Sequence, residues 1–403
     1  MSTLKVDAIR HNSATSDALV LSNDGSVAIG TCTATTINTT NLVNATQLSN
    51  RNKIINGDFT IHQRGGTIAS SNGNYTIDRW RTYRSGDSSG GFSVQQSTSS
   101  YPQTNISGVI DNFKSSAFIT VTSAGSAAAN NNCKFQQRIE GSNCYDLAFG
   151  TAVAKKVTVS FYVKCSLTGT FGMSLVNSAH NRSNVLTYTV NSASTWERKV
   201  VTFDGDTSGS WDFGTGTGLQ LMFDMGSGSS KHASSTGTWL SGEYHGTTSS
   251  VKLIHTNGAT WQVTGVQLEA GEVATPFEFR NQADELQRCQ RYFISINNED
   301  DKFFANGTAY GSSQGYFVVP LPTTMRALPT LVSYSGSGSV YRFLTAGNSQ
   351  YAASLQSWNN GDKTTLTFGG QTSGLSSGNG ILLGVHSSAT GNTNSSVAAS
   401  AEL

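Results

Sequence analysis

The sequence has little charge and little proline. Only 13% of its 403 residues are charged and the formal net charge is +1, whereas globular proteins average about 25% charged residues. A chain with so few cationic side chains cannot neutralise many phosphates, which disfavours a nucleic-acid partner. Proline occurs 5 times and glycine 42 times, so the chain is rich in turn-forming residues and poor in rigid ones.

Long apolar runs are also missing. No stretch of about 18 consecutive apolar residues occurs, which excludes a transmembrane helix and membrane insertion. Residues 1–7 lack the basic and apolar regions of a signal peptide. We therefore expect the chain to fold in the cytoplasm of the cell that makes it.

Cysteine supplies no recognisable site. The 5 cysteines are scattered and none forms a CxxC pair, which argues against zinc and thioredoxin-like motifs. A disulfide between Cys133 and Cys144 is one interpretation, and buried reduced thiols are the one we prefer.

The pattern that dominates the chain is a period of two. Apolar and less apolar side chains alternate in several runs rich in β-branched and aromatic residues, which predicts half-buried strands. The clearest runs are 157–163, 196–203, 219–223 and 261–268. One stretch, 283–293, has helical spacing through Leu286, Cys289 and Phe293. Many short strands separated by turn residues predict an all-β fold of sandwiches or barrels.

Residues 1–50 differ from the rest because they contain no aromatic residue. The turn sequence Asn23-Asp24-Gly25 lies between two apolar runs and predicts a β-hairpin arm. One hairpin with few large apolar residues is only marginally stable alone, so we expect another surface to cover it. The Thr- and Asn-rich stretch 31–50 is interpreted as a connector.

Two further regions follow this arm. Residues 51–280 contain about eight strand-like runs, near the number that a jelly-roll β-sandwich needs. Residues 281–403 begin with the short helix and continue with runs at 316–319, 330–334, 364–368 and 381–385, which predict a small β-sandwich tip.

The polar residues form no convincing catalytic or metal-binding pattern. Asp204, Asp206 and Asp212 resemble half of a calcium loop, but Ser208 and Thr215 stand where an EF-hand needs ligands. A tight polar turn is the preferred interpretation. The histidines and serines match no metal or nucleophile motif, so we assign no catalytic residue, metal or cofactor. Two carboxylates brought together from distant strands would escape sequence inspection, and a hydrolase stays an alternative.

Aromatic residues in polar context are more informative. Trp239 and Trp358 lie among glycine, serine and asparagine, where an aromatic face can stack on a sugar ring while polar neighbours bond its hydroxyl groups. The alternative is that each tryptophan caps or plugs a sandwich. We predict that the receptor or glycan contacts are Trp239, Tyr244, His245, Tyr310, Tyr316, Tyr351 and Trp358.

Several motifs carry a family resemblance. Residues 52–59 with Gln63-Arg64-Gly65, and then residues 75–80, resemble the opening of a common bacteriophage tail-fibre domain. Further similar segments follow in the same order: 136–141, 147–150, 157–163, 195–198, 264–271 and 285–293. The start, residues 3–9, more weakly resembles tail-attachment segments of marine and cyanobacterial phage fibres.

This resemblance implies a homotrimeric virion protein in the phage tail, made in the cytoplasm of the bacterial host. Its N-terminal arm would dock on tail adaptor or nozzle proteins, and its jelly-roll domain would be similar to carbohydrate-binding modules. The attachment residues would be Leu4, Val6, Ile9, Leu19 and Leu21. The stripe of Leu286, Cys289 and Phe293 either meets its symmetry mates on a threefold axis or packs on its own domain.

The sequence therefore predicts a non-enzymatic tail fibre. Residues 1–50 attach, 51–280 form the sandwich, and 281–403 form a distal tip that recognises a glycan or protein on the host surface. Two alternatives belong to other classes. One is a purely structural virion part, such as a tail adaptor or head-decorating fibre, and the other is a polysaccharide-degrading tailspike, which the absence of β-helix repeats disfavours.

Overall fold

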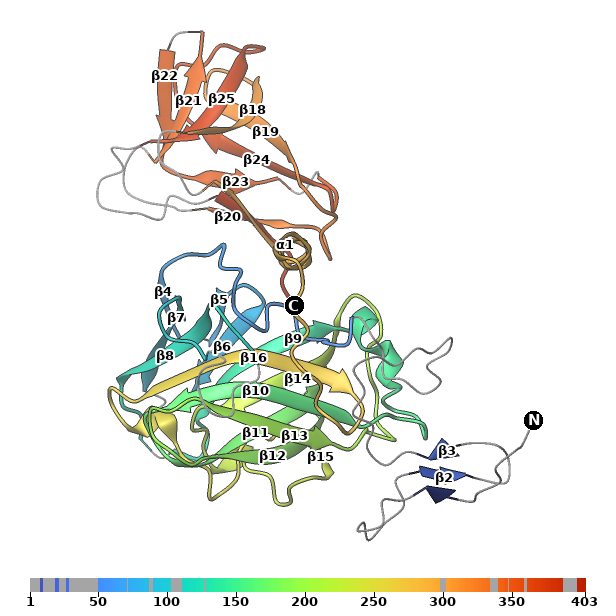
Figure 1. The fold of residues 1–403 in the computed structure, drawn as a ribbon. Helices are drawn as coiled ribbons and strands as arrows, with labels where there is room; N and C mark the ends of the chain where they lie inside the picture. The colour runs from blue at the N-terminus through green and yellow to red at the C-terminus, as the bar shows by residue number, and fades with distance from the viewer. Residues whose placement is uncertain are drawn as a thin grey trace, which may run out of the picture. The chain divides into compact units, whose positions relative to one another are not determined.

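The computed structural model describes residues 8–9, 19–21, 27–28, 50–70, 72–86, 90–102, 111–126, 128–297, 302–333, 340–346, 348–358, 361–386 and 397–403. The chain divides into two compact units, Met1–Thr46 and Gln47–Leu403 (Figure 1). The described residues form mostly strands and one short α-helix. The all-β prediction is confirmed.

The first unit contains three short strands: β1 (Ala8–Ile9), β2 (Leu19–Leu21) and β3 (Val27–Ala28). Strand β2 pairs antiparallel with β3, which confirms the predicted hairpin, and β1 adds a third strand beside β2. Ile9, Leu19 and Leu21 lie in these strands. Leu4 and Val6 lie outside the described residues, and the attachment role of all five stays a prediction.

The second unit begins with two antiparallel sheets. The six-stranded sheet has the order β13 (Glu197–Phe203), β10 (Val157–Cys165), β16 (Thr260–Ala270), β8 (Ser116–Ser123), β7 (Gly91–Ser97) and β4 (Thr67–Ala69). The seven-stranded sheet has the order β15 (Trp239–Ser241), β12 (Arg182–Val190), β11 (Gly169–Asn177), β14 (Thr217–Asp224), β9 (Asn132–Glu140), β6 (Trp80–Ser85) and β5 (Asn72–Ile77). Single 3₁₀ turns occur at Gly141–Asn143, Tyr145–Leu147, Ser229–Lys231 and Leu253–His255.

Strand β10 shows why these residues form a sandwich. Its alternate side chain Phe161 points into the core and meets Phe223 of the opposite sheet, with ring centroids 5.2 Å apart. The next residue, Tyr162, faces the other way and packs with Phe113 and Trp196 in a second, smaller cluster. Both faces of the strand are therefore buried, which explains its nearly continuous apolar and β-branched sequence.

Residues 293–403 build two further sheets. The smaller has the order β17 (Phe293–Asn297), β26 (Val397–Ser400) and β20 (Thr330–Ser333). The larger has the order β22 (Asn348–Ala352), β21 (Tyr341–Thr345), β25 (Gly380–Val385), β18 (Phe303–Ala309), β19 (Gln314–Pro320), β24 (Thr365–Gln371) and β23 (Leu355–Ser357). Their apolar side chains, including Phe317, Phe343 and Val397, form a core separate from that of the sandwich. We call residues 293–403 the distal domain.

The helix α1 (Gln282–Gln290) joins the sandwich to the distal domain. Asn281 caps it, because the Asn281 side chain accepts a hydrogen bond of 2.9 Å from the Ala283 amide. The predicted helix through Phe293 is wrong at its end: Phe293 begins β17 and pairs with Ser400. A strand partner more than 100 residues away overrides the local helical spacing.

The motif at residues 52–59 is a structural junction. Asn56 has φ 58°, and its side chain donates to the carbonyls of Ile61 (2.8 Å) and Asp78 (3.0 Å). Its own amide donates to Glu285 of α1. Gly57 is required because a Cβ there would lie 2.1 Å from the carbonyl oxygen of Val266. This motif therefore holds together the sandwich and the helix.

Candidate functional site

The predicted contact residues fall into two groups. Tyr310, Tyr316, Tyr351 and Trp358 belong to the distal domain, in or beside β18, β19, β22 and β23. Trp239, Tyr244 and His245 belong to the seven-stranded sheet of the sandwich and the loop that follows β15. Only the distal group contains residues that share one exposed surface.

Three of the distal aromatics form a continuous row. The ring centroids of Tyr310 and Tyr316 lie 5.1 Å apart, and those of Tyr316 and Trp358 lie 4.3 Å apart, with edge-to-face geometry in both pairs. Tyr310 is 71% exposed, and the other two side chains are half-buried. Partial desolvation and the neighbouring Tyr310 raise the pKa of Tyr316. We call Tyr310, Tyr316 and Trp358 the aromatic row.

The backbone of three strands positions this row. Tyr316 of β19 lies opposite Gly369 of β24, and a Cβ at Gly369 would lie 2.7 Å from Nε1 of Trp358. The indole therefore lies over a glycine that leaves room for it. Trp358 is fixed by its amide, which donates to the Thr367 carbonyl at 3.1 Å, and by the Thr367 hydroxyl, which donates to the Trp358 carbonyl.

A small recess lies beside Trp358. Leu328, Pro329, Thr365 and Thr367 line it with the indole, and Leu328 is 58% exposed. The surface around the row thus combines aromatic faces, an exposed aliphatic side chain and hydroxyl groups. Such a surface can bind the apolar face of a sugar ring while it offers hydrogen bonds to its hydroxyl groups.

Tyr351 lies outside the aromatic row. It is 39% exposed and packs against His386, with ring centroids 4.6 Å apart. The structure thus brings together three of the four distal residues that the sequence singled out.

The sandwich group does not form an exposed aromatic surface. Trp239 packs edge-on against Phe149 and Trp211, at 5.7 Å and 5.4 Å between centroids, and its Nε1 donates to the Asp204 carbonyl at 2.8 Å. These contacts favour the alternative interpretation of Trp239, in which the tryptophan caps the sandwich. Tyr244 is half-buried in the following loop.

The structure contradicts the prediction that His245 contacts a receptor. It is fully buried, with Nε2 2.7 Å from Oγ of Ser227, so it cannot contact a receptor in this structure. Burial is the main reason why the pKa of His245 is lowered well below its ordinary value. The Ser227 hydroxyl in turn donates to the Cys133 carbonyl. This serine–histidine pair has no access to substrate and is part of the fold.

The stripe of Leu286, Cys289 and Phe293 matches the second of its two alternatives, packing on its own domain. Cys289 is fully buried in a cluster with Ile55, Ile61 and Tyr292, and Leu286 packs against the same cluster. Phe293 is 5% exposed and lies under the guanidinium of Arg64, 3.7 Å from its ring centroid. These residues pack on their own chain, so the buried members are not available to line an inter-chain axis.

The aspartates that resembled half of a calcium loop have partners within the fold. Asp206 forms an ion pair with Arg182, in which the Arg182 Nε to Asp206 Oδ2 distance is 2.9 Å. Asp212 accepts a hydrogen bond of 2.7 Å from the Gly214 amide. Within the described ranges, no group of three or more His, Cys, Asp or Glu side chains could hold a metal ion. The four cysteines described, Cys133, Cys144, Cys165 and Cys289, are buried free thiols.

Membrane spanning by a helix finds no support in the part of the chain that the structure describes. None of its helices is both long and apolar enough to cross a bilayer.

The sequence analysis missed two features of the second unit, Gln47–Leu403. Gly369 makes room for Trp358, but one glycine among 42 gives no sign of this role. A polar recess beside α1 also went unnoticed, because its lining comes from segments far apart in the sequence. Both features become visible only when segments far apart in the sequence are placed in space.

Comparisons with known proteins give only distant similarities. No protein-family model and no curated protein matches the sequence. Among solved structures, the enzymatically active domain of tailspike protein 4 of bacteriophage CBA120 matches with a TM-score of 0.29 and 10% identity, over 55% of this chain and 21% of that chain.

Two binding modules of Clostridium thermocellum are similar to a comparable degree. Its family 11 carbohydrate-binding module has a TM-score of 0.24 and 10% identity, over 52% of this chain and 98% of the module. The C-terminal family 22 module of Xyn10B has a TM-score of 0.25 and 10% identity, over 50% of this chain and 91% of the module. Scores at this level identify no family and transfer no function to this chain.

Proposed function

We propose that this chain is a phage tail-fibre protein that recognises a glycan on the host surface through the aromatic row of its distal domain. The observation that carries the proposal is the contact series Tyr310–Tyr316–Trp358, in which Tyr310 is exposed and the other two side chains are half-buried. Aromatic side chains in an exposed series are costly to leave in water unless they serve a contact. The tail-fibre assignment rests on the resemblance of residues 52–293 to that family.

Recognition here would be binding without catalysis. The aromatic row contains no carboxylate, and the neighbouring Asp362 is engaged by the Thr364 amide and hydroxyl, each at 2.7 Å. Among the described residues, a sugar held on this surface would meet aromatic rings, the Leu328 side chain and hydroxyl groups. Weak single contacts become strong attachment when several copies bind one cell surface, which suits a homotrimeric fibre in a virion tail.

A microbial glycan array tests the proposal. The full chain should bind a subset of bacterial surface glycans, and Trp358→Ala should abolish that binding while the melting temperature stays close to the wild-type value. Tyr351→Ala is the matched control, since it removes an exposed tyrosine of the same domain outside the row. Equal binding by wild type and Trp358→Ala would overturn the assigned surface.

The glycan array and an assay of released reducing ends together separate the alternative functions. A purely structural virion part would bind no glycan on the array. A tailspike enzyme would release reducing ends from a bound polysaccharide over time, whereas the proposed fibre leaves the polysaccharide intact.

A further inference from the structure

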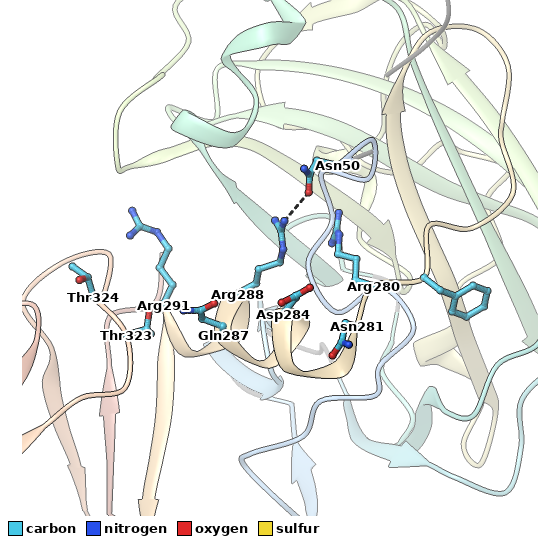
Figure 2. A pocket seen from close by; sticks show the side chains of 10 residues that line it. Asn50, Arg280, Asn281, Asp284, Gln287, Arg288, Arg291, Thr323 and Thr324 are labelled. Atoms are coloured by element: carbon cyan, nitrogen blue, oxygen red, sulfur yellow. Dashed lines mark hydrogen bonds between the residues drawn. The ribbon is translucent and has the colours of Figure 1, made fainter. Parts of the chain in front are cut away.

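A polar recess of about 650 Å³ lies beside α1. Figure 2 shows its lining: Arg288 of the helix points toward Asn50, and Thr323 and Thr324 of the distal domain lie beyond Arg291. The volume is within the range of about 300–1,000 Å³ that is typical of small-molecule sites. No role in the proposed contact surface accounts for this recess.

Two of its three arginines are already neutralised. Arg291 forms a two-pronged ion pair with Glu140, with distances of 2.9 Å and 2.6 Å. Arg280 lies 3.2 Å from Glu285 and 3.3 Å from Glu278, and it also donates to the carbonyl of Ile54. These two guanidinium groups are therefore engaged in ion pairs within the fold.

Arg288 differs from both. Its Nη2 donates to Oδ1 of Asn50 at 2.7 Å, and it forms no ion pair with any residue that the structure describes. A guanidinium has five N–H donors, and two of them in parallel fit one carboxylate. Arg288 is therefore the group in this recess that is available to bind an anion.

The other polar groups suit hydroxyl groups better than a second charge. Asn281, Gln287, Thr323 and Thr324 offer amide and hydroxyl groups, each able to donate and accept. Asp284, one helical turn before Arg288, is exposed and can accept hydrogen bonds from hydroxyl groups. Its charge also disfavours a ligand with several closely spaced anionic groups, such as a phosphate.

The recess continues into a longer groove. Asn50 and Arg288 also line a neighbouring recess of about 370 Å³ with Tyr145, which is 66% exposed. At the other end, Phe279 is 52% exposed and is shared with a third recess of about 410 Å³. Tyr145 and Phe279 thus line this set of recesses together with Arg288. Of the other cations, Lys53 is paired with Asp146 at 2.8 Å, and Lys114 lines only the third recess.

We propose that this groove binds an oligosaccharide that carries a carboxylate, such as a chain containing uronic acids. The carboxylate lies on Arg288, the sugar hydroxyl groups bond the amide and hydroxyl side chains, and ring faces stack on Tyr145 and Phe279. The inference rests on the proposed function, because it names an acidic class of host glycan and a second contact site for it.

Calorimetric titration of the full-length chain with trigalacturonate and with the neutral β-1,4-galactotriose tests this site. Wild type should bind the acidic trisaccharide at least about tenfold more tightly than the neutral one. Arg288→Gln should lose this preference. Lys155→Gln should keep it, because Lys155 is an exposed cation that does not line the groove.

The outcomes separate this site from the aromatic row. Trp358→Ala should retain the preference for trigalacturonate even if it loses array binding, whereas a loss in that variant would assign the acidic ligand to the row and overturn the groove. Equal affinity of wild type for both trisaccharides, or no binding of either, would also overturn it. A similar loss in Arg288→Gln and Lys155→Gln would show non-specific charge attraction only and reject the site.

Discussion

The guanidinium of Arg79 donates to the carboxylate of Glu402, 323 residues further along the chain, and the Arg79 side chain is 1% exposed. Arg64 reaches the same carboxylate at 2.7 Å. Arg79 also lies 3.5 Å from the centre of the Tyr292 ring. One carboxylate thus pairs with two arginines and ties residues 401–403 to the sandwich.

Glu402→Gln should lower the free energy of unfolding by about 3 kcal/mol, because breaking a buried ion pair leaves uncompensated charge in a low-dielectric site. Chemical denaturation of the full chain measures this change. The matched control Glu272→Gln removes a carboxylate that is 65% exposed and should leave stability unchanged. Equal effects of the two substitutions would contradict the structural role of the Arg79–Glu402 pair.

Asp78 should make stability depend on pH in a defined direction. Burial raises the pKa of Asp78 to about 6, against 3.8 for the exposed group, although Arg64 and hydrogen bonds from Gln63 oppose the shift. Between pH 3.8 and about 6, Asp78 is protonated in the folded state and ionised in the unfolded state. The stabilisation that comes from this proton is therefore complete below about pH 4 and is lost as the pH rises through 6.

Comparing wild type with Asp78→Asn isolates this contribution. The free energy of unfolding of wild type relative to Asp78→Asn should fall by about 2 kcal/mol between pH 4.5 and 7. Denaturant titrations at several pH values measure it. Parallel pH profiles for the two proteins would rule out the raised pKa.

Much of the fold follows from local sequence, and the site does not. The runs of β-branched and aromatic residues predict β10 and β16 as strands. The predicted half-burial is wrong, because nearly every residue of both strands is buried. Trp358 meets Tyr316 only because β23 and β19 both pair with β24. His245 looks like an exposed loop residue until its contact with Ser227 is known. Such contacts depend on pairings that no local pattern encodes.

The motifs that carry the family resemblance have a common structural role. Asn56, Gln137 and Glu140 make contacts that join distant segments. Gln137 exchanges hydrogen bonds with the backbone of Ile55. Glu140 accepts a hydrogen bond of 2.7 Å from the hydroxyl of Tyr292, just after α1. These residues position the distal domain and do not themselves form a contact surface. A shared scaffold is therefore compatible with different ligands on different distal domains.

Gly369→Ala should weaken glycan binding without removing any aromatic side chain. The added Cβ would lie 2.7 Å from Nε1 of Trp358, so the indole must move away from Tyr316. Several-fold weaker binding on the glycan array is the expected result. Gly380→Ala is the control, since no atom lies within 4 Å of a Cβ at that position; equal binding by both variants would show that the position of the indole is unimportant.

Light scattering should give a solution mass of three chains, each of 42.6 kDa, for the purified full-length protein. A homotrimer is expected from the tail-fibre resemblance and would multiply weak contacts through avidity. A mass of one chain would contradict the trimeric fibre and favour a single binding module.

The most direct test of the account is the affinity of the full chain for the glycan that binds best on the array, measured by calorimetry for wild type and for Tyr316→Ala/Trp358→Ala. The account predicts saturable binding by wild type and at least about a tenfold loss in the double variant, with both proteins folded at the temperature of the titration. Equal affinities in two folded proteins would contradict the claim that the aromatic row recognises the host surface.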